Sequence, residues 1–200
     1  AAKAIAATTA LQALRDKAAV RPGQTVLVNG ASGGVGTFAV QIAKARGAEV
    51  TGVSSTRNVE LVRSIGADHV IDYKHVDFTR GTERYDVIID NVGNHSLLAL
   101  RRVLEPEGLV VMIGGSGNDQ WIGPLLRPIG AAVLSPFVGQ RFAGLLAELN
   151  PEDLRELGEL LAAGQMKSVI DQHYPLREVP AAIAYLEEGR ARGKVVIDVP

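Results

Sequence analysis

Short apolar runs alternate with amphipathic stretches along most of the chain, and the pattern changes at glycines, prolines and polar turns. The apolar runs have the length and the β-branched content that are typical of strands. They predict six strands: TVLVNG (25–30), AEVTGVSS (48–55), DHVIDY (68–73), YDVIIDNVG (85–93), LVVMIGG (109–115) and AAVLSPFVG (131–139). The fourth run is almost continuously apolar, which indicates a strand that is buried on both faces.

Helices are predicted in the amphipathic stretches that separate these runs. They span about 9–19, 32–47, 58–66 and 95–108, and a glycine closes each of the last three. Strands that alternate with helices in this way predict an α/β protein, in which helices cover both faces of a parallel sheet.

The pattern changes after Gly139. The segment NPEDLRELGELLAAGQ (150–165) begins like a helix, with Asn150 as the N-cap and acidic residues in the first turn. Three further elements do not extend the sheet in an obvious way: a strand at 168–176, a helix at 177–189 and a strand at 194–199. We expect this last part of the chain to belong to a different structural unit.

Composition and charge narrow the class of protein. The 200 residues suffice for one full-sized core with a smaller appendage. The net charge of −1 gives no reason to expect nucleic acid or an anionic membrane as a partner. No apolar stretch approaches the roughly 18 residues of a membrane span. Cysteine is absent, so these residues can form neither disulfides nor thiolate metal sites. A cytoplasmic location fits these features.

A glycine-rich segment joins the first predicted strand to the helix that follows. Gly30, Gly33 and Gly36 form a G-x-x-G-x-x-G pattern. Glycine at such a turn lets the backbone approach a ligand closely, and the amides at the helix start attract an anion. A turn without a ligand is the alternative. Because the motif opens a series of βαβ units, we favour the pyrophosphate of a dinucleotide.

The end of the second predicted strand bears on the choice of dinucleotide. In NAD-binding sites an acidic residue there holds the ribose 2′-hydroxyl, whereas a cation accommodates a 2′-phosphate. Here residues 54–57 supply three hydroxyls and a guanidinium, all of which can donate hydrogen bonds to a phosphate. The alternative is that a hydroxyl only caps the next helix. The two roles are compatible, and we predict that NADPH is favoured over NADH.

Several motifs, taken in order, resemble one known family. The cofactor half of the medium-chain dehydrogenases/reductases, and above all their quinone oxidoreductase (zeta-crystallin-like) branch, is similar to VLVNGASGGVGTFAVQIAKARGAEV (26–50), GADHVIDY (66–73), YDVIIDNVG (85–93) and EEGRARGKVVIDV (187–199). The resemblance covers nearly the whole chain. It implies a Rossmann domain at 1–166, with a doubly wound, parallel, six-stranded sheet, and the C-terminal portion of a GroES-like substrate domain at 167–200. Most of that substrate domain would precede Ala1, so that the chain would be a fragment.

The resemblance also implies cofactor contacts at the strand ends. The pyrophosphate would meet Ser32, Gly33, Gly34 and Val35, the 2′-phosphate would meet Ser54 and Arg57, and the adenosine ribose would lie near Tyr73. The nicotinamide side would be formed by Asn91, Val92, Gly93, Gly114, Gly115, Phe137 and Val138. A lysine of some quinone reductases falls at Asn58, so Arg57 would have to replace it. As alternatives, Tyr73 is a packing residue and Asn91 a helix cap.

The resemblance implies a reaction without nominating a catalytic residue. Zinc-dependent relatives place a cysteine ligand shortly before the first strand, where this sequence has alanines and Ile5, and the four histidines lack metal-ligand spacing. We therefore expect no metal, and hydride transfer from NADPH to a small-molecule quinone or enone. An alcohol or aldehyde reductase of the same fold and a dinucleotide-binding module without turnover are the alternatives. We also expect a homodimer through the apolar sixth strand.

Overall fold

The computed structural model describes residues 2–113, 139–189 and 191–199. Its main sheet contains β1 (Thr25–Asn29), β2 (Glu49–Ser54), β3 (His69–Asp72), β4 (Tyr85–Asp90), β5 (Leu104–Met112) and β6 (Arg141–Gly144). The strands are parallel and lie in the order β3-β2-β1-β4-β5-β6. This is the strand order of a doubly wound Rossmann sheet, so the predicted fold class is confirmed.

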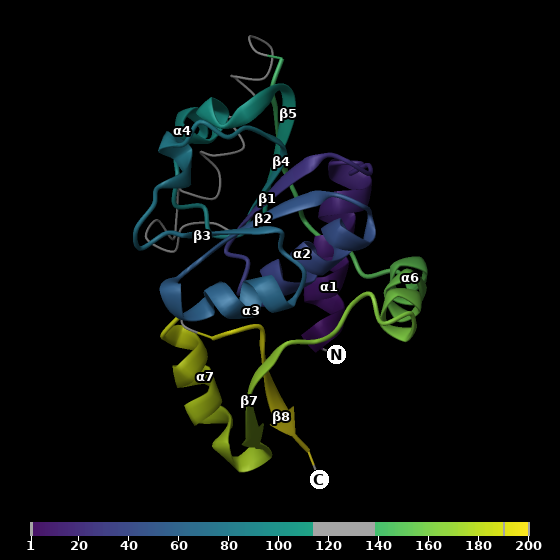
Figure 1. Ribbon diagram of the computed structural model, residues 1–200. Coiled ribbons are helices and arrows are strands. Elements are labelled where there is room, and N and C mark those ends of the chain that lie inside the picture. Colours follow the sequence, from purple (N-terminus) through teal and green to yellow (C-terminus); the bar gives the residue numbers. More distant parts are fainter. Residues whose placement is uncertain (1, 114–138, 190, 200) are drawn as a thin grey trace.

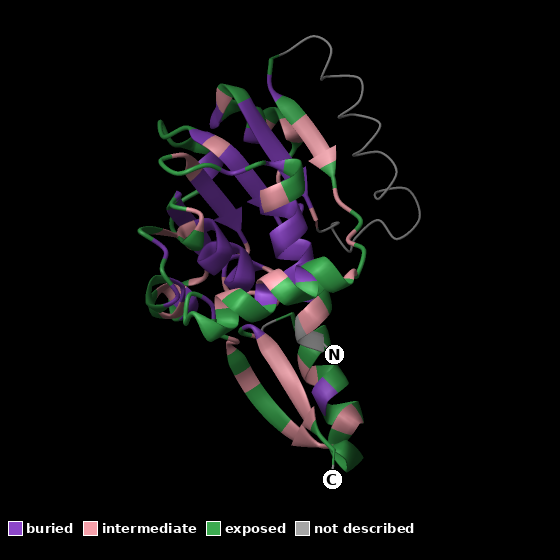
Figure 2. Cartoon of the chain, turned by 90° about the vertical axis from the view of Figure 1, so that its right-hand side faces the viewer, coloured by how far each residue is buried: buried purple, intermediate pink, exposed green. Residues whose placement is uncertain are grey.

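Helices cover both faces of this sheet because side chains of successive strand residues point to opposite faces (Figure 1). Val26 and Val28 of β1 belong to a core that includes residues of α1 (Ala2–Gln12), α2 (Gly36–Ala45) and α3 (Val59–Ser64). Leu27 belongs to a second core with Leu100 of α4 (Leu97–Arg102) on the opposite face. Figure 2 shows that the buried residues concentrate in these central strands and in the helices that pack on them.

The first two helices begin at residues other than those predicted. The first begins at Ala2 and continues through a π-helical turn, η1 (Ala13–Lys17), because its alanine-rich start favours the helix. Thr9 therefore lies inside the helix, where its hydroxyl donates to the Ile5 carbonyl over 2.7 Å. The second begins only at Gly36, which leaves the earlier glycines in the turn.

The helix predicted at 95–108 ends much earlier. It stops at Arg102, and β5 starts at Leu104, so the prediction was wrong from Leu104 to Gly108. Leu104 pairs with Tyr85 and is fully buried, and a register shift follows before Leu109 pairs with Val87. Burial of Leu104 against the sheet therefore outweighs the local helix signal.

The sixth place in the sheet is taken by β6, which begins two residues after the predicted segment. Residues 131–138 of that segment lie outside the described part of the chain. The predicted homodimer through this edge stays a prediction.

The end of the chain forms a small unit beside the Rossmann domain (Figure 1). A parallel two-stranded sheet of β7 (Ile170–Pro175) and β8 (Lys194–Asp198) carries a short turn, η5 (Leu176–Glu178), and α7 (Val179–Glu187). We call this unit the tail, residues 167–199. Figure 2 shows it as mostly intermediate and exposed. Its separate sheet agrees with the prediction that it does not extend the main sheet.

Backbone contacts attach the tail to the Rossmann domain at two places. Gln41 of α2 exchanges two hydrogen bonds with the backbone of Lys167, at 3.0 and 2.8 Å. The Gly193 amide donates to the Ser32 carbonyl over 2.8 Å. The second contact brings the start of β8 directly onto the glycine turn.

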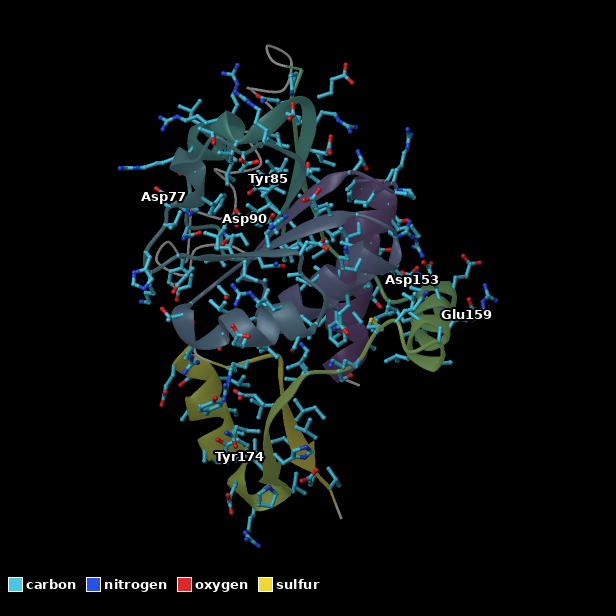
Figure 3. The ribbon with its side chains drawn as sticks, viewed as in Figure 1. Asp77, Tyr85, Asp90, Asp153, Glu159 and Tyr174 are labelled. Atoms are coloured by element: carbon cyan, nitrogen blue, oxygen red, sulfur yellow. The ribbon has the colours of Figure 1, made fainter. Side chains whose placement is uncertain are left out.

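The helix α6 (Pro151–Ala162) packs on α1 through a buried carboxylate. As predicted, Asn150 caps this helix, because its side-chain oxygen accepts a hydrogen bond from the Asp153 amide over 2.8 Å. The Asp153 carboxylate accepts hydrogen bonds from Gln12 and from Arg15, each over 2.6 Å. In Figure 3 Asp153 lies on the side of α6 that is nearer to α1. Although burial alone would raise the pKa of Asp153, these hydrogen bonds hold it below its ordinary value.

Candidate dinucleotide-binding site

A cavity of about 1100 Å³ opens where the carboxyl ends of the central strands meet. Its wall includes Asn29 at the end of β1, Ser54 at the end of β2, Tyr73 after β3, Asn91 after β4 and Ile113 after β5. The chain leaves β1 and β4, which are neighbours, toward opposite sides of the sheet order. Ligands of open parallel sheets bind at this switch point.

The glycine turn forms the floor of the cavity. Gly30 has a φ of +79°, a left-handed conformation that glycine adopts without strain. A Cβ at Gly36 would overlap the Gly30 carbonyl and lie 2.9 Å from the Ala31 Cα, so the start of α2 packs tightly against the turn that follows β1. Val35 is the N-cap of α2, and no side chain caps the first turn. An uncapped helix start at the wall of a cavity is suited to an anion.

A lysine of the tail reaches over this turn. The Lys194 Nζ lies so close to Gly34 that a Cβ there would be 2.6 Å away, and the Gly193 carbonyl would be 3.3 Å from it. Lys194 lines the cavity, and burial lowers the pKa of its ammonium below the ordinary value. The structure thus places a partly desolvated cation beside the amides of the turn, where a pyrophosphate would raise that pKa again.

An acidic residue stands next to the end of β2, although the sequence has none there. In the β2–β3 ladder Ser54 pairs with Asp72. The Thr56 hydroxyl and amide donate to the Asp72 carboxylate, and chiefly the hydroxyl bond lowers the pKa of Asp72. Thr56 opens the short helical turn η2 (Thr56–Asn58), so Asp72 caps this turn. Sequence reasoning missed Asp72 because it comes from the neighbouring strand.

Asn58 connects the end of η2 with the glycine turn. Its side-chain amide donates to the Ser32 Oγ over 3.0 Å, and both residues line the cavity. Asn58 is buried, and its Oδ1 has no hydrogen-bond partner in the described part of the chain. The hydrogen bond to Ser32 therefore ties the end of η2 to the glycine turn.

The end of β4 is held by a polar network. The Asn29 side-chain amide donates to the Asp90 carboxylate over 2.9 Å and to the Asn94 Oδ1 over 3.0 Å. The side-chain amide of Asn91 donates to the Asn29 carbonyl over 2.9 Å, and the Asn91 Oδ1 has no partner among the described residues. Figure 3 shows Asp90 in the interior at the end of β4. The network fixes the segment after β4 against β1.

Cationic side chains line the cavity at two separate places. Arg57 and Lys74 stand at the ends of β2 and β3, and Lys194 stands at the glycine turn. Neither aspartate nor glutamate occurs among the described lining residues. His95, after β4, completes this side and packs edge-on against Phe78, with ring centroids 4.7 Å apart. The charge of the wall therefore favours a polyanion.

The structure brings most of the predicted site residues into this one cavity. The lining includes Ser32, Gly33, Gly34, Val35, Ser54, Arg57, Tyr73, Asn91 and Val92. Gly93 is buried and is absent from the lining, and its amide donates to the Asp90 carboxylate over 2.9 Å. The remaining four, Gly114, Gly115, Phe137 and Val138, lie beyond the described residues. Whether these residues bind a cofactor stays a prediction.

Sequence reasoning missed two cations of the wall. Lys194 belongs to the GRARGK segment, which on local pattern is a helix end and a solvated turn. Lys74 follows the short strand β3 without a motif of its own. The only available signal was topological, because the residues after parallel strands meet at one edge of the sheet.

As for metals, the described residues contain no group of three or more His, Asp or Glu side chains that could hold an ion.

Comparisons with known proteins identify the family to which this chain is similar. Residues 65–197 match the family described as zinc-binding dehydrogenase. A zinc-type alcohol dehydrogenase-like protein of Schizosaccharomyces pombe is 35% identical over 96% of this chain and 57% of its own length. The human mitochondrial NAD(P)H oxidoreductase RTN4IP1 is 36% identical over 88% of this chain and 48% of its own length. The quinone oxidoreductase structure from Coxiella burnetii superposes with a TM-score of 0.84 at 32% identity, over 98% of this chain and 58% of that one.

The chain thus spans about half the length of the curated relatives it matches. Within its described residues, none of the helices is long and apolar enough to cross a membrane. One relative is named as mitochondrial, so a cytoplasmic location stays a prediction.

Proposed function

The chain belongs to the zinc-binding dehydrogenase family, within the medium-chain dehydrogenases/reductases, and we propose that it is the cofactor-binding part of an NADPH-dependent quinone or enone reductase. Relatives named as NAD(P)H and quinone oxidoreductases support the general activity, namely oxidoreduction with a nicotinamide dinucleotide. The choice of NADPH and of an activated double bond or quinone as acceptor is the finer part of the proposal.

The observation that carries the proposal is the wall of the cavity. It combines a glycine turn that leaves no room for a Cβ at Gly36, an uncapped helix start and, among the described lining residues, cations without a carboxylate. The residues present therefore fit a dinucleotide, which carries a pyrophosphate, two riboses and, in NADPH, a third phosphate.

Each part of the wall has a separate task in this proposal. The turn from Ser32 to Val35 and the Lys194 ammonium would hold the pyrophosphate, and the end of β2 would hold the adenosine ribose. The segment after β4 would orient the nicotinamide side, because Asn29 and Asp90 fix it against β1. The bound cofactor supplies a hydride at the nicotinamide ring. The chain's own contribution is to bind and orient it.

Hydride transfer without zinc is a further part of the proposal. It is supported by the sequence, because the 200 residues contain no cysteine for a thiolate ligand. A quinone or an enone is already polarised and so depends less on a Lewis acid than a simple carbonyl does. The acceptor itself stays open within this class.

Titration of the chain with NADPH and NADH tests the proposal. We expect the nicotinamide fluorescence of both cofactors to change on saturable binding, with a lower Kd for NADPH. Lys194→Gln should weaken both cofactors about tenfold, since each carries the pyrophosphate. Lack of saturable binding by either cofactor would exclude the proposed function. Metal analysis of the longer protein, together with assays on quinones, enones and aldehydes, separates the zinc-free reductase from an alcohol dehydrogenase.

A further inference from the structure

We propose that Lys74, at the end of β3, forms with Arg57 a cationic clamp for the 2′-phosphate of NADPH, and that this pair sets the preference over NADH. The inference rests on the proposed function. It assigns the preference to two side chains from neighbouring strands rather than to the hydroxyls after β2. Both cations line the same cavity.

Two of the three hydroxyls at the end of β2, those of Ser54 and Thr56, are directed to protein groups. Ser54 is buried, and its Oγ lies 3.4 Å from the Ser55 carbonyl. The Thr56 hydroxyl donates to the Asp72 carboxylate. A phosphate at this end of the cavity would therefore depend on cations more than on these two hydroxyls.

The backbone after β3 brings Lys74 to the level of the β2 end. Because Ser54 pairs with Asp72, the residues that follow the two strands leave the sheet side by side. The Lys74 amide donates to the Asp72 side chain over 2.9 Å, and the His75 and Val76 amides donate to the Asp72 carbonyl over 3.0 and 2.9 Å. This tight turn fixes the Lys74 backbone at the rim of the cavity.

Tyr73 holds the ammonium of Lys74 near the rim. The Lys74 Nζ lies 5.3 Å from the centroid of the Tyr73 ring, within the range of a cation–π contact. The Tyr73 ring is 54% exposed and lines the cavity. An exposed ring gains little from packing, so its contact with the ammonium explains its position better than the core does.

Asp72 makes the second cation necessary. Its carboxylate stands beside the end of β2, and it is absent from the described lining of the cavity. The groups that face it are Thr56, the Lys74 amide and the imidazole of His75, whose Nε2 is 3.6 Å away. Its negative charge lies next to the end of β2 and would oppose the binding of a phosphate there. Lys74 restores a net positive charge where a 2′-phosphate, with close to two negative charges, would lie.

The test compares ligands that differ only in the 2′-phosphate. Kd values for NADPH and NADH, and for adenosine 2′,5′-bisphosphate and AMP, are measured with the unmodified chain, Lys74→Gln and Arg57→Gln. Lys17→Gln is the matched control, because it removes the same charge at an exposed residue of η1 that does not line the cavity.

We expect Lys74→Gln to weaken NADPH and the bisphosphate about tenfold, and NADH and AMP less than about twofold. Lys74→Arg should retain the preference, and Lys17→Gln should change none of the four constants. Equal losses for ligands with and without the 2′-phosphate, or unchanged constants in Lys74→Gln, would overturn the clamp. Either result leaves the proposed function standing if NADH and AMP still bind, whereas loss of all binding in the unmodified chain removes both.

Discussion

Neighbouring glycines of one turn meet different atoms, and the difference separates packing from binding. A Cβ at Gly36 would run into the backbone of Gly30 and Ala31, whereas at Gly34 it would first meet the Lys194 ammonium, the end of a flexible side chain. Backbone cannot move aside without disturbing β1, but an ammonium can rotate away. The glycine pattern alone therefore predicts the turn, and only the structure shows which glycine serves which purpose.

We expect Gly36→Ala to destabilise the fold by about 1–3 kcal/mol, the usual cost of overpacking a core. Gly34→Ala should cost less than about 1 kcal/mol and yet weaken NADPH, because it displaces Lys194 from the turn. Urea unfolding and fluorescence titration measure the two effects. Gly158 is the control, since a Cβ there meets nothing within 4 Å, and Gly158→Ala in α6 should stabilise slightly. Equal unfolding free energies for Gly34→Ala and Gly36→Ala would contradict this division.

For single residues, the sequence predicts the members of short continuous motifs, but it does not predict contacts between residues that are distant in the chain. The residues of the glycine turn and of the β2 end form short continuous motifs, and they line the cavity. Lys194 reaches the same turn from the far end of the chain, through the hydrogen bond from Gly193 to Ser32. Asp72 meets Thr56 only because β3 pairs with β2. Such contacts depend on the register and on the tail, for which a single sequence carries no local signal.

Among the elements, α6 shows how a buried charge joins two helices. Asp153 is 1% exposed, whereas its partner Arg15 is 28% exposed and also contacts Asp16 and Glu156. The helix itself was predictable from its cap, Asn150, and its acidic first turn. Its partner helix was not, because α1 and α6 are separated by the whole sheet in sequence. Likewise, the predicted end of α4 was wrong, because Leu104 is buried in β5 and the helix ends before it.

We expect Asp153→Asn to destabilise the fold by about 1.5–3 kcal/mol at neutral pH, the usual worth of hydrogen bonds to a charged group. Because hydrogen bonds hold the pKa of Asp153 below its unfolded value, the carboxylate stabilises the fold above the ordinary pKa of about 4. That stabilisation is lost as the pH falls through the lowered folded pKa. The difference in urea midpoint between the variant and the unmodified chain should therefore shrink in acid.

Asp16→Asn is the control, because the Asp16 side chain is 45% exposed and also pairs with Arg15. It should change the unfolding free energy by less than about 1 kcal/mol. A difference for Asp153→Asn that stays constant down to about pH 2 would show that packing, and not the charge, accounts for the loss.

The whole molecule consists of a well-buried Rossmann domain and a tail with little core of its own. Within the described tail, Ala182 is the one buried apolar residue, whereas the central strands β1, β2 and β4 of the main sheet are mostly buried. Figure 1 shows the tail projecting from the domain, with β7, β8 and α7 side by side. The sequence predicted this change of pattern, because the tail strands follow a break in the alternation of apolar runs. Its attachment to the glycine turn required the structure.

We propose that the 200-residue chain binds NADPH but turns over a quinone or enone poorly or not at all. The described cavity already provides the turn, the β2 end and the segment after β4. The matched relatives are about twice as long, and in our proposal their remaining part orients the acceptor. Orientation can supply roughly 7–11 kcal/mol of a barrier, so its absence should cost many powers of ten in rate.

Steady-state assays of the 200-residue chain and of a longer protein that contains it, with NADPH and the same acceptors, measure this difference. Cofactor titration of both proteins is the control, because it should give Kd values within about tenfold of each other. If the chain alone retains a substantial fraction of the activity, its own residues must orient the acceptor. The tail beside the glycine turn would then be the first place to look for them, because it brings Lys194 into the cavity.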